Sequence, residues 1–547
     1  MELGGWRRGF HAMETDNKKQ KQNAWIKGAL YLSLAAFLAK GLSALYKIPY
    51  QNLTGDTGFY VYQQVYPLYG IAFVLGTYGF PIVIAKIVAE QRESSKENGT
   101  KLLQERLLVI FGTLMVLHGS IGLFVIIFAE VIASIMGDAE LINAIRMMGL
   151  PFFLIPFLAI GRGVYQGLGN NVPTAISQVV EQLVRVIVIL GIAWWAMAQG
   201  NPYLAGTSAG IGAFVGGIAA ILIFIFVLRK YNHIFLQSKK YRISESLPWK
   251  MDLKDILING FFVSVSALAL VIFQFIDSMS MFRLLVSEGV SPIEAAVAKG
   301  IYDRGWPLIQ FGAVVTTVFS YGVVPVLAMA FKRRERALVL TNVGYAVKVS
   351  LIFGGAAAVG LATIMPYLNG MMFMDRLGTG ALQISAFVVL FGALFMTIAA
   401  LLHAVNKASL AAGVLMIGLT VKLVLNVALI PTYGITGGAG SSLIAFMLMG
   451  LASLVIIKRL LLWTPLTFIF WLKWLLSLMS MFAVVWGYQW VLGQFLATGR
   501  AFDTIIALTG AALGGFIYLI IIWKVKLFEK KEWESVPKLG AILPYKD

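Results

Sequence analysis

The stretch LAGTSAGIGAFVGGIAAILIFIFVL, residues 204–228, contains no charged side chain and is followed by Arg229 and Lys230. A helix needs roughly 20 apolar residues to cross the hydrocarbon core of a bilayer, so this stretch is long enough to span one. Its GTSAGIG segment loosely resembles a dinucleotide-binding loop, but no strand precedes it. Small residues four positions apart instead favour close packing between membrane helices. We therefore interpret the stretch as a transmembrane helix.

The rest of the chain repeats this pattern. Of its 547 residues, 59% are hydrophobic and 13% are charged, and the apolar residues fall in long runs broken by short charged patches. This composition is typical of a polytopic membrane protein. We expect an all-α fold with about fourteen transmembrane helices. The expected spans are residues 25–48, 58–86, 106–134, 140–161, 173–198, 204–228, 255–284, 297–328, 341–366, 380–404, 408–430, 436–457, 466–492 and 503–524.

Lysine and arginine residues are distributed unevenly over the connections between these spans. The formal net charge of +18 could suggest nucleic-acid binding, but in a membrane protein basic residues first mark the cytoplasmic side. They crowd the N-terminal tail and alternate connections, whereas connections 199–204 and 431–436 carry none. We therefore expect both termini in the cytoplasm, an even number of spans and no nucleic-acid partner.

No side-chain pattern indicates a metal site or a nucleotide-hydrolysing site. The chain has no cysteine, which excludes disulfides and thiolate metal ligands. His118 and His403 stand alone, without the spacing of metal ligands. The P-loop pattern G-x-x-x-x-G-K-[ST] does not occur. We expect neither a cofactor nor an enzymatic activity.

The sequence contains an internal repeat. YQQVYPL, residues 62–68, aligns with YDRGWPL, residues 302–308, early in the second span of two blocks of six spans. Both blocks begin in the cytoplasm, so they would be parallel repeats, which is a plan used by transporters. We expect two six-helix lobes around a central cavity, plus two accessory helices. The expected division is a basic cytoplasmic tail (1–24), an N-lobe (25–228), a cytoplasmic linker (229–254), a C-lobe (255–460), accessory spans (461–525) and a cytoplasmic C-terminal tail (526–547).

Each block also carries two prolines in its second span, Pro67 and Pro81 in the first and Pro307 and Pro325 in the second. Proline removes a helical hydrogen bond and kinks a helix. Two interpretations are open: a helix that bends or lines a cavity, and a static kink filled by a neighbouring side chain.

Charged and amide side chains lie within the first two spans of each block. A charge near the bilayer centre costs at least about 2.5 kcal/mol, so it should face water or a partner. Lys40 lies about 15 residues, or roughly 22 Å, into its span. We expect Arg304 to face water between the lobes; the alternative is an Asp303–Arg304 pair that reaches the outer interface. The polar residues of these spans are Lys40, Gln63, Gln64, Asp277, Asp303 and Arg304.

A second polar set lies deeper in each block. Glu181 and Arg185 are one helical turn apart and can pair with each other. Arg185 aligns in the repeat with Lys422, and two cations near the midplane would favour an anionic ligand, whereas a purely structural pair is the alternative. We assign Lys40, Arg304, Arg185, Lys422, Gln63, Gln64 and Asn426 as substrate-binding candidates, and Asp277, Asp303 and Glu181 as charge partners or ligands of a coupling ion.

Three stretches resemble a known group of membrane proteins. They are GVYQGLGNNVPTAISQVVEQLVR (163–185), GFPIVIAKIVAE (79–90) and YDR (302–304). In these stretches the chain is similar to members of the multidrug/oligosaccharidyl-lipid/polysaccharide flippase superfamily. Within it, the chain resembles the polysaccharide biosynthesis proteins related to stage V sporulation protein B and to lipid II flippases. The resemblance covers about residues 25–525.

The resemblance implies translocation of a lipid-linked sugar by alternating access, with the substrate diphosphate in a cationic central cavity. Lys40 falls where lipid II flippases carry a first-helix arginine, but Gln63, Gln64 and apolar residues replace the basic residues of their second helix. We therefore expect a flippase for an undecaprenyl-diphosphate-linked sugar, either lipid II or another polysaccharide unit, in the bacterial cytoplasmic membrane. Its expected partners are this anionic lipid-linked oligosaccharide, membrane lipids and cell-envelope synthesis enzymes; Na⁺, H⁺ or the membrane potential would drive it.

Other functions require features that differ from these. A cation-coupled multidrug exporter of the same superfamily would need an unpaired carboxylate deep in one lobe and fewer cations. A membrane glycosyltransferase or ligase would need a large pocket outside the membrane, and no connection is long enough to build one. A structural scaffold would leave the inward charges as an unexplained cost.

Overall fold

The computed structural model describes residues 41–43, 45–93, 99–230, 253–321, 323–463, 466–495, 499–529 and 532. These residues form helices joined by turns, with no strand among them, which confirms the all-α prediction. The helices are α2 (Lys47–Val74), η1 (Leu75–Gly79), α3 (Phe80–Glu93), α4 (Gly99–Ile127), α5 (Ala129–Met136), η2 (Ala139–Leu141), α6 (Ile142–Gly149), η3 (Leu150–Leu154), α7 (Ile155–Gly167), α8 (Val172–Ala198), α9 (Pro202–Lys230), η4 (Asp255–Asn259), α11 (Gly260–Ser287), α12 (Pro292–Asp303), α13 (Gly305–Tyr321), α14 (Val323–Lys332), α15 (Arg336–Phe373), α16 (Thr379–Ala386), α17 (Val388–Ala404), α18 (Ala408–Leu461), α19 (Phe468–Phe495) and α20 (Arg500–Lys524).

Eleven helical segments of the described residues are long and apolar enough to cross a membrane. One of them, Ala408–Leu461, includes two of the expected spans, and Gly41–Gln91 includes the span 58–86 together with the described end of the span 25–48. The expected span 297–328 is missing from the eleven because it is divided among α12, α13 and α14. The chain is therefore a multi-pass membrane protein, and the exact number of fourteen spans stays a prediction.

Glycine explains why two long segments contain more than one span. Gly55 within α2 has a φ of 67°, and Gly434 within α18 has a φ of 55°. A positive φ is readily accessible to glycine but costly for most other residues. The chain therefore changes direction at each of these glycines, and the residues on both sides of it are helical. The first expected span thus runs past residue 48 as far as Gly55. Its residues 25–40, including Lys40, lie outside the described residues.

Three of the four prolines singled out in the sequence lie within the first three residues of a helix. Pro81 is the second residue after the π-helix η1, Pro307 the third residue of α13, and Pro325 the third residue of α14. Because α3 continues directly from η1, Pro81 lacks an N–H that could bond to the preceding helical turn. Pro67 lies inside α2.

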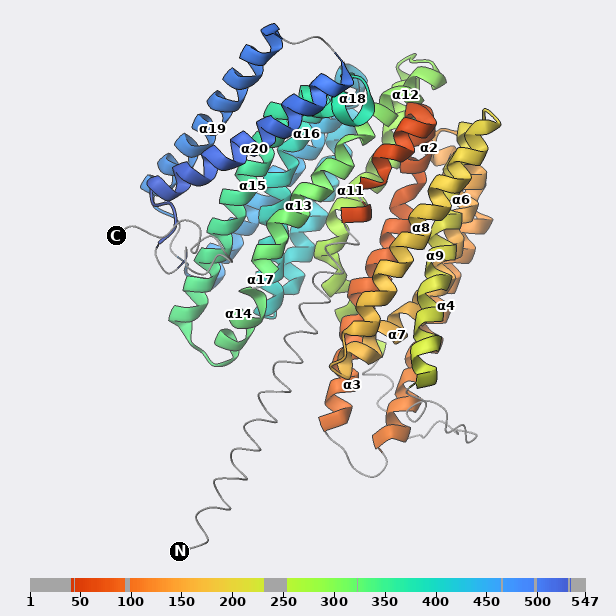
Figure 1. Cartoon of the computed structure of the whole chain (residues 1–547). Coiled ribbons are helices and arrows are strands. Elements are labelled where there is room, and N and C mark those ends of the chain that lie inside the picture. The colour runs from red at the N-terminus through yellow and green to blue at the C-terminus, as the bar shows by residue number, and fades with distance from the viewer. Residues whose placement is uncertain are drawn as a thin grey trace, which may run out of the picture.

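Two groups of helices can be distinguished in Figure 1, α2 to α9 on one side and α13 to α20 on the other. Contacts between the first and second halves of the sequence are made mainly by α2, which packs against α11 and α12. Helices α19 and α20 pack against each other and against α15. The second span of the first half therefore lies beside the first two spans of the second half, where the sequence places its membrane-embedded polar groups.

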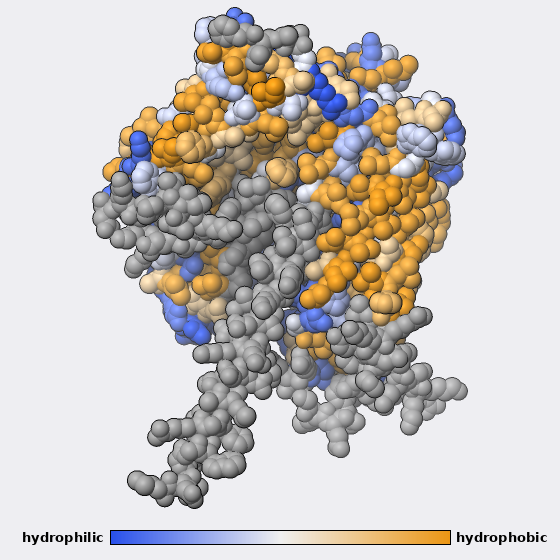
Figure 2. Space-filling model, in the orientation of Figure 1, coloured by the Kyte–Doolittle hydropathy of each residue, from blue (hydrophilic) through white to orange (hydrophobic). Residues whose placement is uncertain are grey.

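Large apolar side chains cover the outer surface. Figure 2 shows a broad hydrophobic band on both sides of the visible face, and Trp194, Phe226 and Phe468 are 67%, 76% and 80% exposed. Such a surface would favour aggregation in water but matches the hydrocarbon of a bilayer. The charged residues of the interior are correspondingly few, and their contacts define the candidate site.

Candidate functional site

A buried lysine lies near the end of the first span. Lys47 is fully buried in α2, eight residues before the Gly55 turn, which places it about 12 Å below that end of the helix. Its Nζ atom lies 3.6 Å from the centroid of the Tyr66 ring and has no hydrogen-bond partner among the described residues. The sequence prediction named Lys40 as the cation of this span; Lys40 is not described, and Lys47 was missed.

A buried arginine lies at the middle of α8. Arg185 donates a hydrogen bond of 3.0 Å from Nη2 to Ser43 Oγ. Its guanidinium carbon lies 4.6 Å from the centroid of the Tyr69 ring and 5.5 Å from that of Tyr46. The predicted pair with Glu181 is wrong, because no carboxylate lies within ion-pair distance of Arg185 among the described residues.

Five tyrosines join these two cations into one cluster. The Tyr66 ring stacks on that of Tyr62, with centroids 5.7 Å apart, and is tilted against that of Tyr69, with centroids 6.0 Å apart. Electron-rich ring faces attract cations by about 2 kcal/mol when the contact is desolvated, so the rings offset part of the cost of burying charge. We call this group the tyrosine cluster; its members are Tyr46, Tyr50, Tyr62, Tyr66 and Tyr69, with Lys47 and Arg185.

Glu181 pairs with Arg162 of α7 and not with Arg185. The Arg162 guanidinium also donates to Thr77 Oγ1 at 2.8 Å and to the Gly76 carbonyl at 3.3 Å. Both acceptors belong to the π-helix η1, whose altered hydrogen-bond register makes a carbonyl available to a side chain. Arg162 was not among the predicted site residues; it lies on α7, the helix that precedes α8 in the chain.

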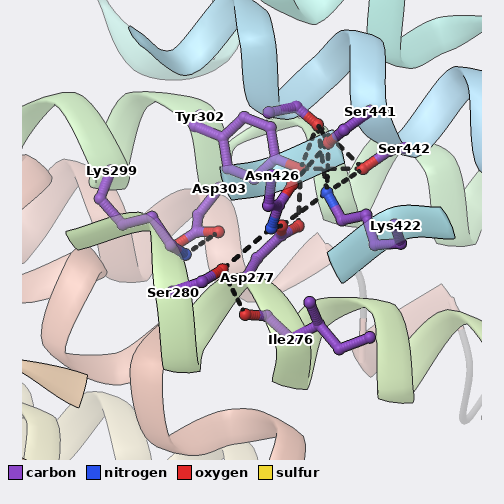
Figure 3. A network of polar contacts seen from close by, with 11 residues as sticks. Ile276, Asp277, Ser280, Lys299, Tyr302, Asp303, Lys422, Asn426, Ser441 and Ser442 are labelled. Carbon is purple, nitrogen blue, oxygen red and sulfur yellow. Dashed lines mark hydrogen bonds and ion pairs between the residues drawn. The ribbon is translucent and has the colours of Figure 1, made fainter. Parts of the chain in front are cut away.

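A polar network in the second half connects α11, α12 and α18 (Figure 3). Lys422 forms an ion pair of 2.6 Å with Asp277, and both side chains are fully buried. Asn426 donates to Asp277 Oδ1 at 3.0 Å, and the Tyr302 hydroxyl donates to Oδ2 at 2.7 Å. The structure thus brings together three predicted site residues, Asp277, Lys422 and Asn426.

The Asp303–Arg304 pair, which was the alternative to an Arg304 that faces water, is not formed. Asp303 instead accepts hydrogen bonds of 2.6 and 2.7 Å from Lys299, one turn earlier in α12. Lys299, which is 1% exposed, was not among the predicted site residues. Adjacent residues of a helix point about 100° apart, which is why Asp303 and Arg304 reach different partners.

Arg304 is fully buried between two carboxylates from distant parts of the chain. Its Nη2 lies 2.7 Å from Asp56 Oδ2, and its Nη1 lies 2.6 Å from Asp375 Oδ1. Asp56 follows the Gly55 turn in the first half, and Asp375 lies in the turn between α15 and α16. The expectation that Arg304 faces water between the lobes is therefore corrected: the described structure shows it as an ionic link between the two halves of the sequence.

The electrostatics of Asp375 follow from this link. Burial alone would raise the pKa of the Asp375 carboxyl, but hydrogen bonds from Arg304 and from the Leu377 N–H hold the pKa below its ordinary value. The group is consequently ionised at neutral pH and remains available to Arg304.

The two predicted glutamines also connect the halves. Gln63 Nε2 donates to the Asp303 carbonyl at 3.5 Å, and Gln64 Nε2 donates to the Ser278 carbonyl at 3.1 Å. Both side chains are buried. They join α2 to α12 and α11 through the main chain.

A groove lies where α19 packs against α15. Its volume is about 600 Å³, and it runs between α15, α16 and α19. Aromatic side chains form much of its wall, with Arg376 and Gln489 as polar groups. The aromatic lining residues are Tyr367, Phe387, Phe482, Trp486 and Trp490.

The Arg304 link should contribute more to stability than an exposed ion pair. Asp56→Asn is expected to lower the free energy of unfolding by about 1.5–3 kcal/mol, because it weakens the charged hydrogen bonds of a buried guanidinium that keeps its pair with Asp375. Glu130→Gln, which breaks the exposed Arg146–Glu130 pair of 2.9 Å, should cost less than about 1 kcal/mol. Thermal unfolding of the purified variants in detergent measures both; equal losses would show that the Arg304 link carries no special weight.

Comparison with known proteins places this geometry in context. The model of the family "Polysaccharide biosynthesis protein" matches residues 25–331. The membrane protein YabM of Bacillus subtilis (strain 168) is 34% identical over 531 residues, covering 94% of this chain and 95% of YabM. The lipid II flippase MurJ of the same organism is 24% identical, covering 92% of this chain and 96% of MurJ.

A solved structure shares the fold. The structure titled lipid II flippase MurJ in an inward closed conformation superimposes with a TM-score of 0.65 at 16% identity, covering 90% of this chain and 98% of that one. At this identity the likeness concerns the arrangement of the helices and not the side chains of a site.

Proposed function

The chain belongs to the family of polysaccharide biosynthesis proteins within the flippase superfamily that includes the lipid II flippases, and from this premise we propose that it translocates an undecaprenyl-diphosphate-linked sugar across the bacterial cytoplasmic membrane. The cargo would be lipid II or another polysaccharide repeat unit. The reaction moves the lipid between leaflets and forms or breaks no covalent bond.

The observation that carries the proposal is the contrast between two kinds of buried cation. Arg162, Lys299, Arg304 and Lys422 each contact at least one carboxylate. In the part of the chain that the structure describes, Lys47 and Arg185 form no ion pair, although the Asp303 carboxylate, which is paired with Lys299, attracts Lys47 at longer range. Burying an uncompensated charge costs several kcal/mol, of which the tyrosine rings recover only part. An anion that binds during transport would compensate both charges.

The chemistry of the tyrosine cluster suits a diphosphate. A guanidinium presents several N–H donors to phosphate oxygens, and an ammonium adds a second positive charge. Ring faces can also pack against a sugar or the first isoprene units. We assign Lys47 and Arg185 as the principal phosphate-binding residues, with Lys40 as an additional candidate from the sequence. Arg304 and Lys422, predicted earlier as phosphate ligands, would instead organise the protein.

Alternating access would move two lobes relative to each other. In this proposal the N-lobe comprises residues 25–228, the C-lobe 255–460 and the accessory spans 461–525, with both termini in the cytoplasm. The Arg304 link to Asp56 and Asp375 would hold the lobes together at the outer side and would separate when that side opens. The aromatic groove beside α19 would hold part of the prenyl chain.

The multidrug-exporter alternative is less well supported. Such a protein would use a carboxylate deep in the membrane to bind a cationic substrate or coupling ion. The carboxylates at mid-span, Glu181 and Asp277, each contact a cation, and the two cations of the tyrosine cluster would repel a cationic drug.

Reconstitution tests the substrate class. Liposomes that contain the protein should expose a fluorescent undecaprenyl-diphosphate-linked sugar from the inner leaflet at least ~10-fold faster than protein-free liposomes. A phosphatidylglycerol carrying the same fluorophore should move at the protein-free rate. Equal acceleration of both lipids would reveal unselective scrambling, and acceleration of neither, with cationic dye uptake instead, would favour the exporter.

A further inference from the structure

The ammonium group of Lys422 lies in a cage of oxygen atoms (Figure 3). Its Nζ is 2.6 Å from Asp277 Oδ1, 2.7 Å from Ser442 Oγ, 3.0 Å from Ser441 Oγ and 3.2 Å from the Gly438 carbonyl. An ammonium has three N–H donors, so these four contacts use all of them. No donor is left for a ligand from outside the cage.

The cage is held in position by groups other than the lysine. Asp277 is fixed by the Asn426 amide and by the Tyr302 hydroxyl. Ser441 Oγ donates to Asn426 Oδ1 at 2.5 Å. The Asp277 carboxylate and the Ser441 hydroxyl therefore have hydrogen-bond partners other than Lys422 that help to hold them in place.

Backbone constraints add to this preorganisation. The cage residues of α18 follow the Gly434 turn, which brings the second part of the helix back beside Lys422 on the first part. A Cβ atom at Gly438 would lie 2.1 Å from Met281 Cε, so this position holds its carbonyl in a space that only glycine fits without displacement of Met281.

The donor set has the composition of a site for a monovalent metal ion. One carboxylate oxygen, two hydroxyls and one carbonyl are hard oxygen ligands, and ions of this kind are often bound at interrupted membrane helices. The single negative charge of Asp277 neutralises one positive charge. A divalent ion would leave an uncompensated charge in a site that is fully buried.

We propose that this cage is an alkali-cation site whose cation is the ammonium of the chain itself. Lys422 permanently occupies the place that Na⁺ or K⁺ would take, so the intact protein binds neither ion there. Any Na⁺ dependence of transport would have to arise elsewhere. The inference concerns ion binding by the purified protein and stands independently of the transported substrate.

Removal of the amine provides the test. Lys422→Ala should leave Asp277 without a cation and open the cage to an alkali ion. Its unfolding midpoint in detergent is measured in NaCl, KCl and choline chloride at equal ionic strength. We expect a saturable rise of at least about 3 °C between 1 and 100 mM Na⁺ or K⁺, with choline ineffective. The wild-type midpoint should be the same in all three salts.

Three further variants complete the design. Lys422→Ala/Asp277→Asn removes the carboxylate as well and should lose the response to Na⁺ and K⁺. Lys422→Ser replaces Lys422→Ala if the latter does not accumulate. If neither single variant accumulates while Lys422→Met/Asp277→Asn does, cellular Na⁺ and K⁺ cannot substitute for the amine, and the proposal is wrong.

Two further results would overturn the inference. A purified Lys422→Ala protein that responds equally to Na⁺, K⁺ and choline would reduce the cage to an ordinary ion pair. A wild-type protein that shows an alkali-specific shift, lost in Asp277→Asn, would show that the cage accepts an ion despite Lys422.

Discussion

Replacing Arg162 with alanine is expected to lower the amount of protein in the membrane several-fold. Arg162 is fully buried, and its removal leaves the Glu181 carboxylate in the interior with the Tyr69 hydroxyl, at 3.3 Å, as its remaining hydrogen-bond donor. Breaking a buried pair in this way costs about 3–5 kcal/mol, which is enough to reduce cellular abundance strongly. Quantitative immunoblotting of membrane fractions gives the result.

A double variant separates charge from packing in this prediction. Arg162→Met/Glu181→Leu removes both charges and keeps apolar volume, so it should recover much of the lost abundance. Arg146→Ala, which breaks the exposed pair with Glu130, serves as the control and should accumulate normally. Wild-type abundance of Arg162→Ala would mean that water or another group compensates Glu181.

The membrane fold follows from the sequence because its signal is long and uniform. Apolar runs of about 20 residues define spans through the cost of burying polar backbone in hydrocarbon, which no local detail overrides. The positions of the turns at Gly55 and Gly434 also agree with the sequence, since each glycine lies between two apolar runs. The end of the first span was predicted too early, at residue 48, whereas the helix continues to Gly55. A span that ends at residue 48 puts Lys47 at its end and Lys40 well inside it, and Lys40 was the predicted cation.

The partners of the buried charges were harder to predict than their positions. Glu181 and Arg185 have the spacing of a helical pair, but such a pair contributes only about 0.2–0.5 kcal/mol. Arg162 reaches Glu181 from α7, and two acceptors in η1, the Gly76 carbonyl and Thr77 Oγ1, fix the orientation of its guanidinium. No spacing rule within one helix can anticipate that arrangement, because it depends on how α7, α8 and η1 pack.

The same limit applies to Arg304. Its two carboxylates lie 248 and 71 residues away in the sequence, so neither could be recognised as a partner before the helices were placed. The repeat alignment did identify the helix that carries the arginine. The helical segments that carry the charged groups were thus predictable, whereas the direction of each side chain was not.

The second large effect is expected at the tyrosine cluster. Arg185→Ala and Lys47→Ala should each abolish most of the transport, because each removes a positive charge from the proposed diphosphate site. Their stability should behave in the opposite way from that of Arg162→Ala. Removing a buried cation that has no carboxylate partner relieves a desolvation cost, so the unfolding midpoint should stay unchanged or rise. A structural cation would instead lower the midpoint.

Arg185→Lys refines this prediction. Lysine retains the positive charge but loses the planar set of donors that can grip two phosphate oxygens at once. The variant should therefore keep part of the transport, whereas Arg185→Gln, which is polar but neutral, should not.

The most direct measurement is equilibrium binding of radiolabelled undecaprenyl diphosphate to the purified protein in nanodiscs free of other prenyl lipids. We predict saturable binding that is weakened about 10- to 100-fold by Arg185→Ala and by Lys47→Ala, since each charged hydrogen bond contributes about 1.5–3 kcal/mol. Arg146→Ala should bind as the wild type does. Unchanged affinity in a folded Lys47→Ala/Arg185→Ala protein would contradict the assignment of the tyrosine cluster as the diphosphate site.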